Sequence, residues 1–290
     1  MIGRVALSMA SVACALSVAA PALASEVSVG SPPDRTPQNH QNEPAVAIDA
    51  NHPSFAVAGW NDFVDWARCP QADATQFGTC ADPADDGVGL SAVAFSFDSG
   101  NTWIRPAYTG WTAADCDPTA ACSAHEGTIH TLPWYYESGL VSDGDPSLAF
   151  GPRPGPDGTF SWANGSRLYY TNLTANFSAE RSEQTFKGFE AIAVSRTDDP
   201  RAAAAGDASA WMDPVIISRQ NAALFSDHEQ VWADNAASSP FFGNAYSCYA
   251  AFRSQEVGGF PAPIVVARST DGGDTWTQKQ IGRASCRERV

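Results

Sequence analysis

One eight-residue motif, Ser-x-Asp-x-Gly-x-Thr-Trp, occurs twice in this chain and constrains the fold more than any other feature. We call the copies the first turn motif (residues 96–103) and the second turn motif (residues 269–276). Each follows a run of alternating apolar residues, at 90–97 and 263–268. In such a turn, Asp accepts hydrogen bonds from nearby backbone N–H groups, Gly takes a positive φ, and Trp begins the return strand. The motif predicts two β-hairpins with structural roles for Ser96, Asp98, Gly100, Thr102, Trp103, Ser269, Asp271, Gly273, Thr275 and Trp276.

Three similar units can be traced along the chain. A degenerate third copy of the motif lies at residues 195–198, before an alanine-rich insertion and Trp211. Each copy is preceded by an acidic or polar residue that leads into a short apolar run, at residues 43–48, 145–150 and 228–232. A further run follows each of these, at residues 54–60, 167–173 and 244–252. The pattern predicts four short strands per unit and no helix in the mature chain.

Repeated four-stranded units are typical of the blades of a β-propeller, which is an all-β fold. We therefore expect residues 42–280 to form about three blades, after a lead-in at residues 25–41. Three blades cannot close a ring, so the ring is expected to be incomplete.

The two turn motifs resemble those of the sialidase superfamily and the wider group of Asp-box (BNR) repeat propellers. The resemblance covers most of residues 40–280 and implies that this chain is an N-terminal part of such a propeller. It also implies that the turn motifs lie on outer hairpins, on the face opposite the active site. The implied activity is exo-glycosidase-like hydrolysis of extracellular glycoconjugates.

The three strand entries supply the candidate catalytic residues Glu43, Asp145 and Glu229. If the following runs are the innermost strands, these carboxylates lie together near the mouth of the central channel. They could then bind Ca²⁺, bind sugar hydroxyls, or form the acid/base pair of a glycosidase. The alternative is that each one caps a turn or is solvated.

The sialidase pattern is not matched in full. Sialidases carry Phe-Arg-Ile-Pro before the first innermost strand, and that arginine helps to clamp the substrate carboxylate. Aligning its proline with Pro44 puts Asn42 in the place of the arginine, which makes Asn42 a candidate substrate-binding residue without the charge of the fork. Arginines elsewhere, at positions 153, 167 and 253, could contribute instead. The family's tyrosine nucleophile and glutamate partner lie late in its chains, beyond the part matched by this sequence.

Residues 65–140 are expected to form an insertion-rich region above the blades. It holds four cysteines, for which we favour the disulfides Cys69/Cys80 and Cys116/Cys122 among three possible pairings. Its aromatic triplet, Trp134-Tyr135-Tyr136, is suited to stacking on sugars, so these residues are candidate substrate-binding residues. An acidic cluster in the same region comprises Asp82, Asp85, Asp86, Asp115 and Asp117. The alternative is a disulfide-stapled loop with a solvated acidic surface.

Both ends of the chain differ from its middle. Residues 1–24 read as a secretory signal peptide with a small-residue cleavage site at residues 22–24, which predicts an extracellular or periplasmic protein with no membrane insertion after cleavage. Residues 281–290 resemble a translated sequencing adapter, so we leave them out of the predicted domain. The formal net charge of −15 at pH 7 disfavours nucleic acid and anionic lipid as partners and leaves an extracellular glycan or glycoprotein.

No metal site or cofactor is predicted beyond a possible Ca²⁺. His125 and His130 are five residues apart across a glycine, which does not fit the zinc-binding helix of a zinc protease. Three functions remain open: a sialidase-like glycoside hydrolase, a non-catalytic propeller that binds glycans or proteins, and an Asp-box polysaccharide hydrolase that uses two carboxylates.

Overall fold

The computed structural model describes residues 26–28, 38–67, 87–116, 123–178, 182–218, 221–253 and 262–284. Half of the chain is strand and 5% is helix, so the predicted all-β class is confirmed. Within the described ranges, no helix is long and apolar enough to span a lipid bilayer. The predicted signal peptide lies outside these ranges, as do Cys69, Cys80, Cys122 and four of the five clustered acids, Asp82, Asp85, Asp86 and Asp117.

The first sheet is an antiparallel meander of β1 (Gln41–Ile48), β2 (Ala56–Asp62) and β3 (Ser91–Ser96). Its central strand, β2, is buried along its whole length, because hydrophobic clusters cover both of its faces. An isolated bridge between Phe95 and Ile104 continues the sheet after the first turn motif.

The second sheet contains β7 (Ser147–Pro154), β8 (Phe160–Asn176), β9 (Ala191–Thr197) and β10 (Trp211–Ile216) in that spatial order. The short strand β6 (Leu140–Ser142) pairs with the far end of β8. The insertion between β9 and β10 contains η3 (Ala208–Ala210) and a short helix, α1 (Pro200–Ala204).

The expectation that the mature chain forms no helix is therefore wrong at α1. Asp199 caps this helix, since its carboxylate accepts hydrogen bonds from the N–H groups of Arg201 and Ala202. Pro200 occupies the first turn, where the missing N–H of a proline costs nothing. Alanine then favours the helical conformation over the next residues.

The third sheet is formed by β11 (Phe225–Ala233), β12 (Ala245–Phe252), β13 (Ala262–Ser269) and β14 (Thr277–Ala284), in sequence order. β14 runs into the segment that the sequence marks as foreign, since Ala284 pairs with Ala262. Backbone pairing does not depend on the origin of a segment, so the foreign character of residues 281–290 stays a prediction.

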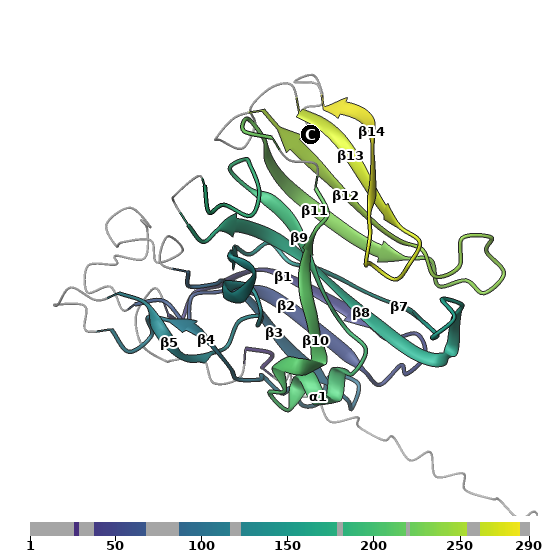
Figure 1. Cartoon of the computed structure of the whole chain (residues 1–290). Helices are drawn as coiled ribbons and strands as arrows, with labels where there is room; N and C mark the ends of the chain where they lie inside the picture. Colours follow the sequence, from purple (N-terminus) through teal and green to yellow (C-terminus); the bar gives the residue numbers. More distant parts are fainter. Residues whose placement is uncertain are drawn as a thin grey trace, which may run out of the picture.

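The three sheets pack in sequence order, with their first strands side by side and β7 between β1 and β11 (Figure 1). One hydrophobic cluster fills the space between the first and second sheets and includes Phe95, Tyr170 and Trp211. A second cluster lies between the second and third sheets and includes Tyr169 and Tyr249. None of the sheets closes on itself.

Residues 65–140, the predicted insertion-rich region, include β3 and the first turn motif, which the sequence also places there. The inserted segments flank that strand. The second of them forms a hairpin of β4 (Tyr108–Thr112) and β5 (His125–Ile129), followed by η2 (Tyr136–Ser138). A small hydrophobic cluster joins Phe63 and Trp66, which follow β2, to Leu90 and Ala113.

Candidate functional site

Both turn motifs close through the same hydrogen bonds. In the first, the Asp98 carboxylate accepts from the Thr102 N–H at 2.8 Å and from the Thr102 hydroxyl at 2.6 Å. The Ser96 hydroxyl donates to Asp98 and accepts from the Gly100 N–H at 2.9 Å. These bonds to the ionised form lower the pKa of Asp98, with those from Thr102 the strongest. Trp103 packs beside the cluster of Trp60, so the contacts are those of a structural turn.

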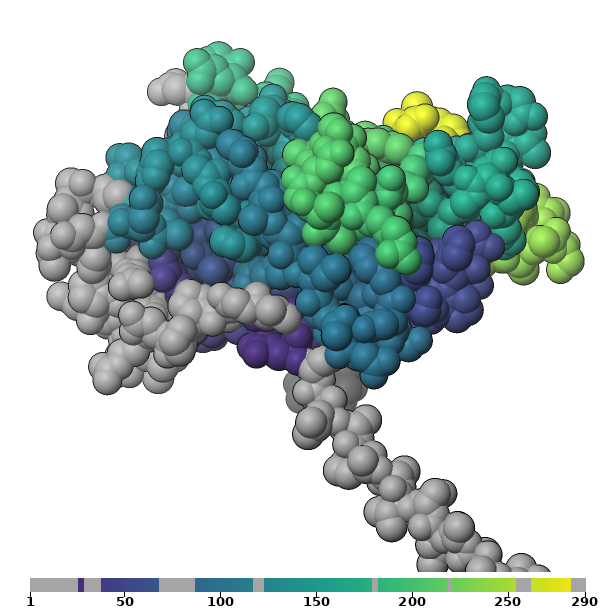
Figure 2. Space-filling view, turned by 90° about the horizontal axis from the view of Figure 1, so that it is seen from below, coloured from purple at the N-terminus to yellow at the C-terminus, as the bar shows by residue number. Residues whose placement is uncertain are grey.

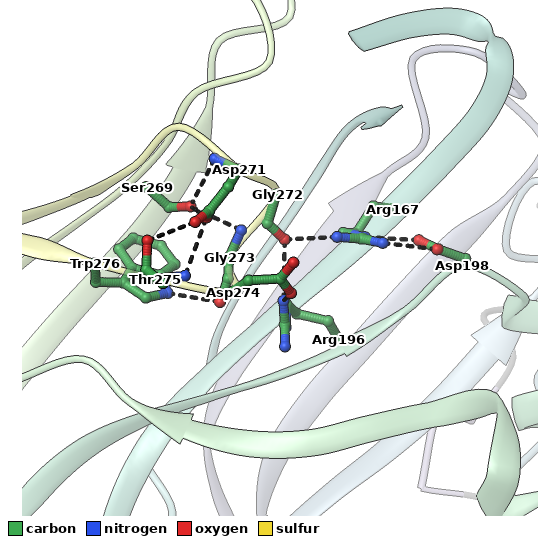
Figure 3. Close-up of polar contacts among 10 residues, drawn as sticks. All are labelled: Arg167, Arg196, Asp198, Ser269, Asp271, Gly272, Gly273, Asp274, Thr275 and Trp276. Atoms are coloured by element: carbon green, nitrogen blue, oxygen red, sulfur yellow. Dashed lines mark hydrogen bonds and ion pairs between the residues drawn. The ribbon is translucent and has the colours of Figure 1, made fainter. Parts of the chain in front are cut away.

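The second turn motif repeats these bonds with Ser269, Asp271, Gly273 and Thr275, and it also docks onto the second sheet (Figure 3). Its Trp276 packs against the cluster between the second and third sheets and donates to the Gly273 carbonyl. The turn is thus part of the contact between two sheets.

The turn motifs and the strand entries lie at opposite ends of the sheets. In the first sheet, Asn42 pairs with Asn61, and Asn61 pairs with Ser91 at the start of β3. Ser96, at the other end of β3, begins the first turn motif. The third sheet is arranged in the same way. Ala250 of β12 pairs with Asp227, at the entry of β11, and with Ile264, near the start of β13. Function at the strand entries would therefore be remote from the turns.

A β-bulge recurs at the entries of the first and third sheets. The register shift in β1 leaves Glu43 and Pro44 opposite Trp60, and the shift in β11 leaves His228 and Glu229 opposite Tyr249. Bulges of this kind redirect side chains and are frequent beside binding sites.

The same left-handed backbone occurs at all three entries. The φ angles are 50° at Glu43, 51° at Asp145 and 58° at His228. His228 is therefore the third equivalent of Glu43 and Asp145, and Glu229 takes the place of Pro44 and Pro146. The third entry thus begins at residue 228, as in the sequence pattern, and Glu229 lies one residue further along than the other two acids. Non-glycine residues adopt this conformation at a cost of about 1–3 kcal/mol, and such strain gathers at functional sites.

The three strand entries line one cavity of about 370 Å³. We call it the entry cavity. Its walls are residues 43–46, 145–148 and 228–231, so each of the three sheets contributes one wall. All three predicted acids, Glu43, Asp145 and Glu229, are among these residues, whereas Asn42 is exposed and is not. The β7 and β11 walls are joined by the Val231 N–H, which donates to the Ser147 hydroxyl at 3.0 Å.

Asp145 is held in place by Asn61 from the neighbouring sheet. The Asn61 side-chain amide donates to the Asp145 carboxylate at 2.9 Å, and the Asp145 N–H donates to the Asn61 side-chain oxygen at 2.6 Å. Gly144, with a φ of 91°, makes room for this pair, since a Cβ there would lie 2.5 Å from the Asn61 oxygen. The carboxylate is therefore positioned before any ligand arrives.

Glu229 is almost completely buried, and neither of its side-chain oxygens has a hydrogen-bond partner. Burial raises its pKa well above the usual value, and the nearby Asp145 and Asp227 carboxylates raise it further. Only its own backbone N–H acts in the opposite direction. Burial therefore favours the protonated form of Glu229 beside the cavity.

Glu190 extends this acidic group, since it precedes β9 and bridges to Phe225. Burial raises its pKa well above the usual value, and Asp143, Glu229 and Asp227 add to the effect. Despite these acids, no group of three or more His, Cys, Asp or Glu side chains in the described ranges has the geometry to hold a metal ion. The strand entries therefore place the buried carboxyl groups of Glu229 and Glu190, whose pKa values are raised, close to further acidic side chains.

The aromatic triplet does not form a sugar-stacking surface. Tyr135 is only 4% exposed, and its hydroxyl contacts Asn172 and Ser195 in the core. Trp134 is half-buried and donates its indole N–H to the Ala208 carbonyl at 2.7 Å. The burial of Tyr135 and its hydrogen bonds in the core argue against the predicted role of this residue in binding substrate.

Tyr136 is half-buried and stacks on Trp111, with ring centroids 4.2 Å apart. The insertion between β9 and β10 packs on the segment that follows the first turn motif, as the green and blue-teal surfaces in Figure 2 show. The Tyr108 hydroxyl donates there to the Ala203 carbonyl at 2.9 Å. These aromatic residues connect sheets and do not line the entry cavity.

The predicted disulfides remain predictions. Cys116 is buried, but its expected partner Cys122 lies outside the described ranges, as do Cys69 and Cys80. Asp115, the described member of the acidic cluster, is exposed and pairs with His125 at 3.3 Å.

The three arginines considered for a carboxylate clamp are engaged elsewhere. Arg153 and Arg167 both pair with Asp198, near the second turn motif. Arg253 lines a separate hollow of about 140 Å³ on the third sheet. Among the described residues, neither Arg nor Lys lines the entry cavity.

Sequence reasoning missed Asn61, Asp143, Glu190 and Asp227. The predicted acids came from the strand entries and the 65–140 region, whereas Asn61 lies near the end of β2 and Glu190 precedes β9. Polar residues at the ends of otherwise apolar strands were the available signal.

A comparison with protein-family models finds no match for this chain, and a comparison with curated proteins finds none either.

Proposed function

We propose that the three sheets are blades of an Asp-box β-propeller that acts on glycans, with the entry cavity as its ligand site. The observation that carries this proposal is the convergence of Glu43, Asp145 and Glu229, from three different sheets, on one cavity. In a propeller, the entries of the innermost strands surround the central channel, where ligands bind.

The packing of the sheets supports the propeller. Each sheet is an antiparallel meander, and the first strands β1, β7 and β11 lie side by side in order. Apolar side chains stay exposed on the outward faces of the two end sheets: Val46 (64%) and Ile48 (63%) on β1, and Trp232 (43%) on β11. Exposed apolar residues on a blade face are those that a further blade would cover.

The chemistry of the cavity suits glycoside hydrolysis by two carboxyl groups. Such enzymes need one carboxyl group that holds a proton to give to the leaving oxygen, and one ionised carboxylate. Glu229 is protonated, and the carboxylate of Asp145 is oriented by Asn61. We assign Glu229 as the proton donor and Asp145 as the carboxylate, while Glu43 is placed to bind sugar hydroxyls.

This proposal departs from the sialidase pattern in one respect. A sialidase clamps an anionic substrate with arginines, whereas acids and no arginine or lysine are found among the described residues that line the entry cavity. We therefore favour the two-carboxylate hydrolase over the sialidase-like activity. The second candidate is a propeller that binds glycans without cleaving them, which the burial of Glu229 favours.

We further propose that the protein is exported and that its partner is an extracellular glycan or glycoprotein. The apolar N-terminal segment and its small-residue cleavage pattern support export. The excess of acidic residues supports a partner other than nucleic acid or anionic lipid.

The test is a screen of the full chain against neutral, cationic and anionic oligosaccharides, with binding measured by calorimetry and cleavage by chromatography. We expect binding and slow cleavage; cleavage should be lost and binding weakened in Asp145→Asn, and both should be retained in Asp213→Asn, which removes an exposed charge from β10. Binding without cleavage would establish the second candidate. The absence of binding to every oligosaccharide would overturn the proposed function.

A further inference from the structure

The entry cavity has a strongly one-sided charge. Among its described lining residues, Glu43, Asp145 and Glu229 are acidic, and His228 is the one group that can carry a positive charge. The His228 ring is largely exposed and lies 3.7 Å from the carboxylate of Asp227, which would neutralise it. An anionic ligand would meet only like charge here, whereas a cationic ligand would be attracted.

Glu229 indicates what such a ligand would contact. It is a buried carboxyl group whose two oxygens lack hydrogen-bond partners, which is rare because each unsatisfied buried polar group costs about 1–3 kcal/mol. It lies in the wall of the cavity, beside the half-buried Asp145. A buried polar group of this kind is explained if a ligand completes its hydrogen bonds.

From these observations, and resting on the glycan-binding part of the proposed function, we propose that the entry cavity selects glycans that carry a protonated amino group, and that binding displaces a proton from Glu229, so that such a glycan is held without being cleaved. The ammonium group approaches the Asp145 carboxylate and the Glu229 carboxyl group. The O–H bond of Glu229 breaks, its proton passes to solvent, and the resulting carboxylate pairs with the ammonium. One positive charge enters as one proton leaves, so the charge of the site is conserved.

The groups that face Glu229 are consistent with this exchange. A negative charge on Glu229 is opposed by three neighbouring acids: Asp227 on β11, Asp145 before β7 and Glu190 before β9. Tyr135 and Tyr170, from the hydrophobic cluster between the first and second sheets, also interact with Glu229, and burial raises their pKa values above the usual range. Without a cation, Glu229 therefore keeps its proton, and a bound ammonium reverses that preference.

The test compares two oligosaccharides of equal length that differ only in charge: a glucosamine oligomer and its N-acetylated form. Titrations of the full chain are run by calorimetry at about pH 6, where amines of this kind are largely protonated. Each is repeated in two buffers of different ionisation enthalpy, which reveals proton exchange. We expect the glucosamine oligomer to bind about tenfold more tightly or better and to release about one proton.

Three variants sharpen the test. Glu229→Gln should bind without proton release, and Asp145→Asn should lose the preference for the amine. Asp213→Asn, which changes an exposed charge on β10, should match the unaltered chain in both respects. A change in far-ultraviolet circular dichroism would identify a variant that fails to fold, and the proton count of the unaltered chain then decides alone.

The outcomes separate this inference from the proposed function. Equal affinity for the two oligomers, or binding without proton release, would overturn the inference and leave glycan binding at the cavity intact. Failure of every oligosaccharide to bind would overturn both. Tighter binding of an anionic oligosaccharide would overturn the inference and restore the sialidase-like reading.

Discussion

Arg167 of β8 donates a hydrogen bond of 2.7 Å to the carbonyl oxygen of Gly272, at the tip of the second turn motif (Figure 3). Its other nitrogens form a two-point pair with Asp198 at 2.7 and 2.8 Å. A side chain of the second sheet thus ties the degenerate copy of the motif, which contains Asp198, to the intact copy in the third sheet. Neighbouring units are joined through their turns as well as through their apolar faces.

The first prediction concerns this junction. Arg167→Ala should destabilise the protein by about 3–5 kcal/mol, because it leaves a mostly buried Asp198 without its two-point partner. Urea unfolding followed by tryptophan fluorescence would measure the loss.

Arg153→Ala is the matched control, since Arg153 pairs with the same carboxylate at 3.1 Å but is 46% exposed, against 8% for Arg167. Its cost should stay below about 1 kcal/mol. Equal costs for the two variants would show that the junction does not contribute as described.

The second prediction separates backbone strain from packing between sheets. Gly100 and Gly273 occupy the same place in the two turn motifs, with φ angles of 82° and 95°. A Cβ on Gly100 would meet only Trp103 at 3.9 Å, whereas one on Gly273 would lie 2.6 Å from Arg196 and 3.1 Å from Tyr169.

Gly100→Ala should therefore cost about 1–2 kcal/mol, from positive φ alone. Gly273→Ala should cost about 1–3 kcal/mol more, because it also pushes the second and third sheets apart. Thermal unfolding of both variants would measure the difference, and a smaller loss at Gly273 would contradict the proposed packing.

The third prediction follows from the buried acids. The pKa values of Glu229 and Glu190 are raised in the folded state, so their contribution to stability is complete below about pH 4.5, the usual pKa of a glutamate. It is lost as the pH rises towards the folded-state pKa values, because the unfolded chain releases these protons first. The melting temperature should therefore fall between about pH 5 and 8.

Glu229→Gln should flatten this decline and raise the melting temperature at neutral pH, since an amide does not ionise. Glu43→Gln, which alters an exposed side chain of the same cavity, should leave the decline unchanged. A melting temperature that rises with pH in the unaltered chain would refute the assignment of Glu229 as a protonated acid.

The fourth prediction tests how Asn61 acts. Asn61→Ala removes both hydrogen bonds that position Asp145 and should weaken binding of the glucosamine oligomer by about tenfold. If Asn61 acts only through Asp145, adding Asn61→Ala to Asp145→Asn should cost nothing further. Calorimetric titration of the two single variants and the double variant would measure this coupling, and additive losses would assign Asn61 an independent role.

Much of the architecture followed from the sequence. The turn motifs, the alternating apolar runs and the strand entries were located to within a few residues, because local hydrogen bonding and side-chain alternation determine them. The short helix α1 was missed because its cap, Asp199, outweighs the helix-breaking neighbours. The buried position of Tyr135 was missed because exposure in an irregular segment depends on the sheets packed around it.

Some features of the candidate site could likewise be predicted from the sequence, and others could not. The acidic character of Glu43, Asp145 and Glu229 was visible in the chain, and so was their position ahead of strands. The sequence pattern began the third entry at His228, but the bulge that leaves His228 and Glu229 opposite Tyr249 was not visible, since it depends on the pairing of β11 with β12. The clamp by Asn61 and the isolation of the Glu229 carboxyl group were equally hidden.

The sequence by itself therefore determined the all-β class, the three repeated units and the turns that close their hairpins, since these depend on interactions between residues close together in the chain. Only the tertiary structure decided which side chains of different sheets meet in one cavity and which of the acids keeps its proton. Both depend on burial and on distances between residues far apart in the chain, because a charge is costly only where the packing of neighbouring sheets removes water from around it.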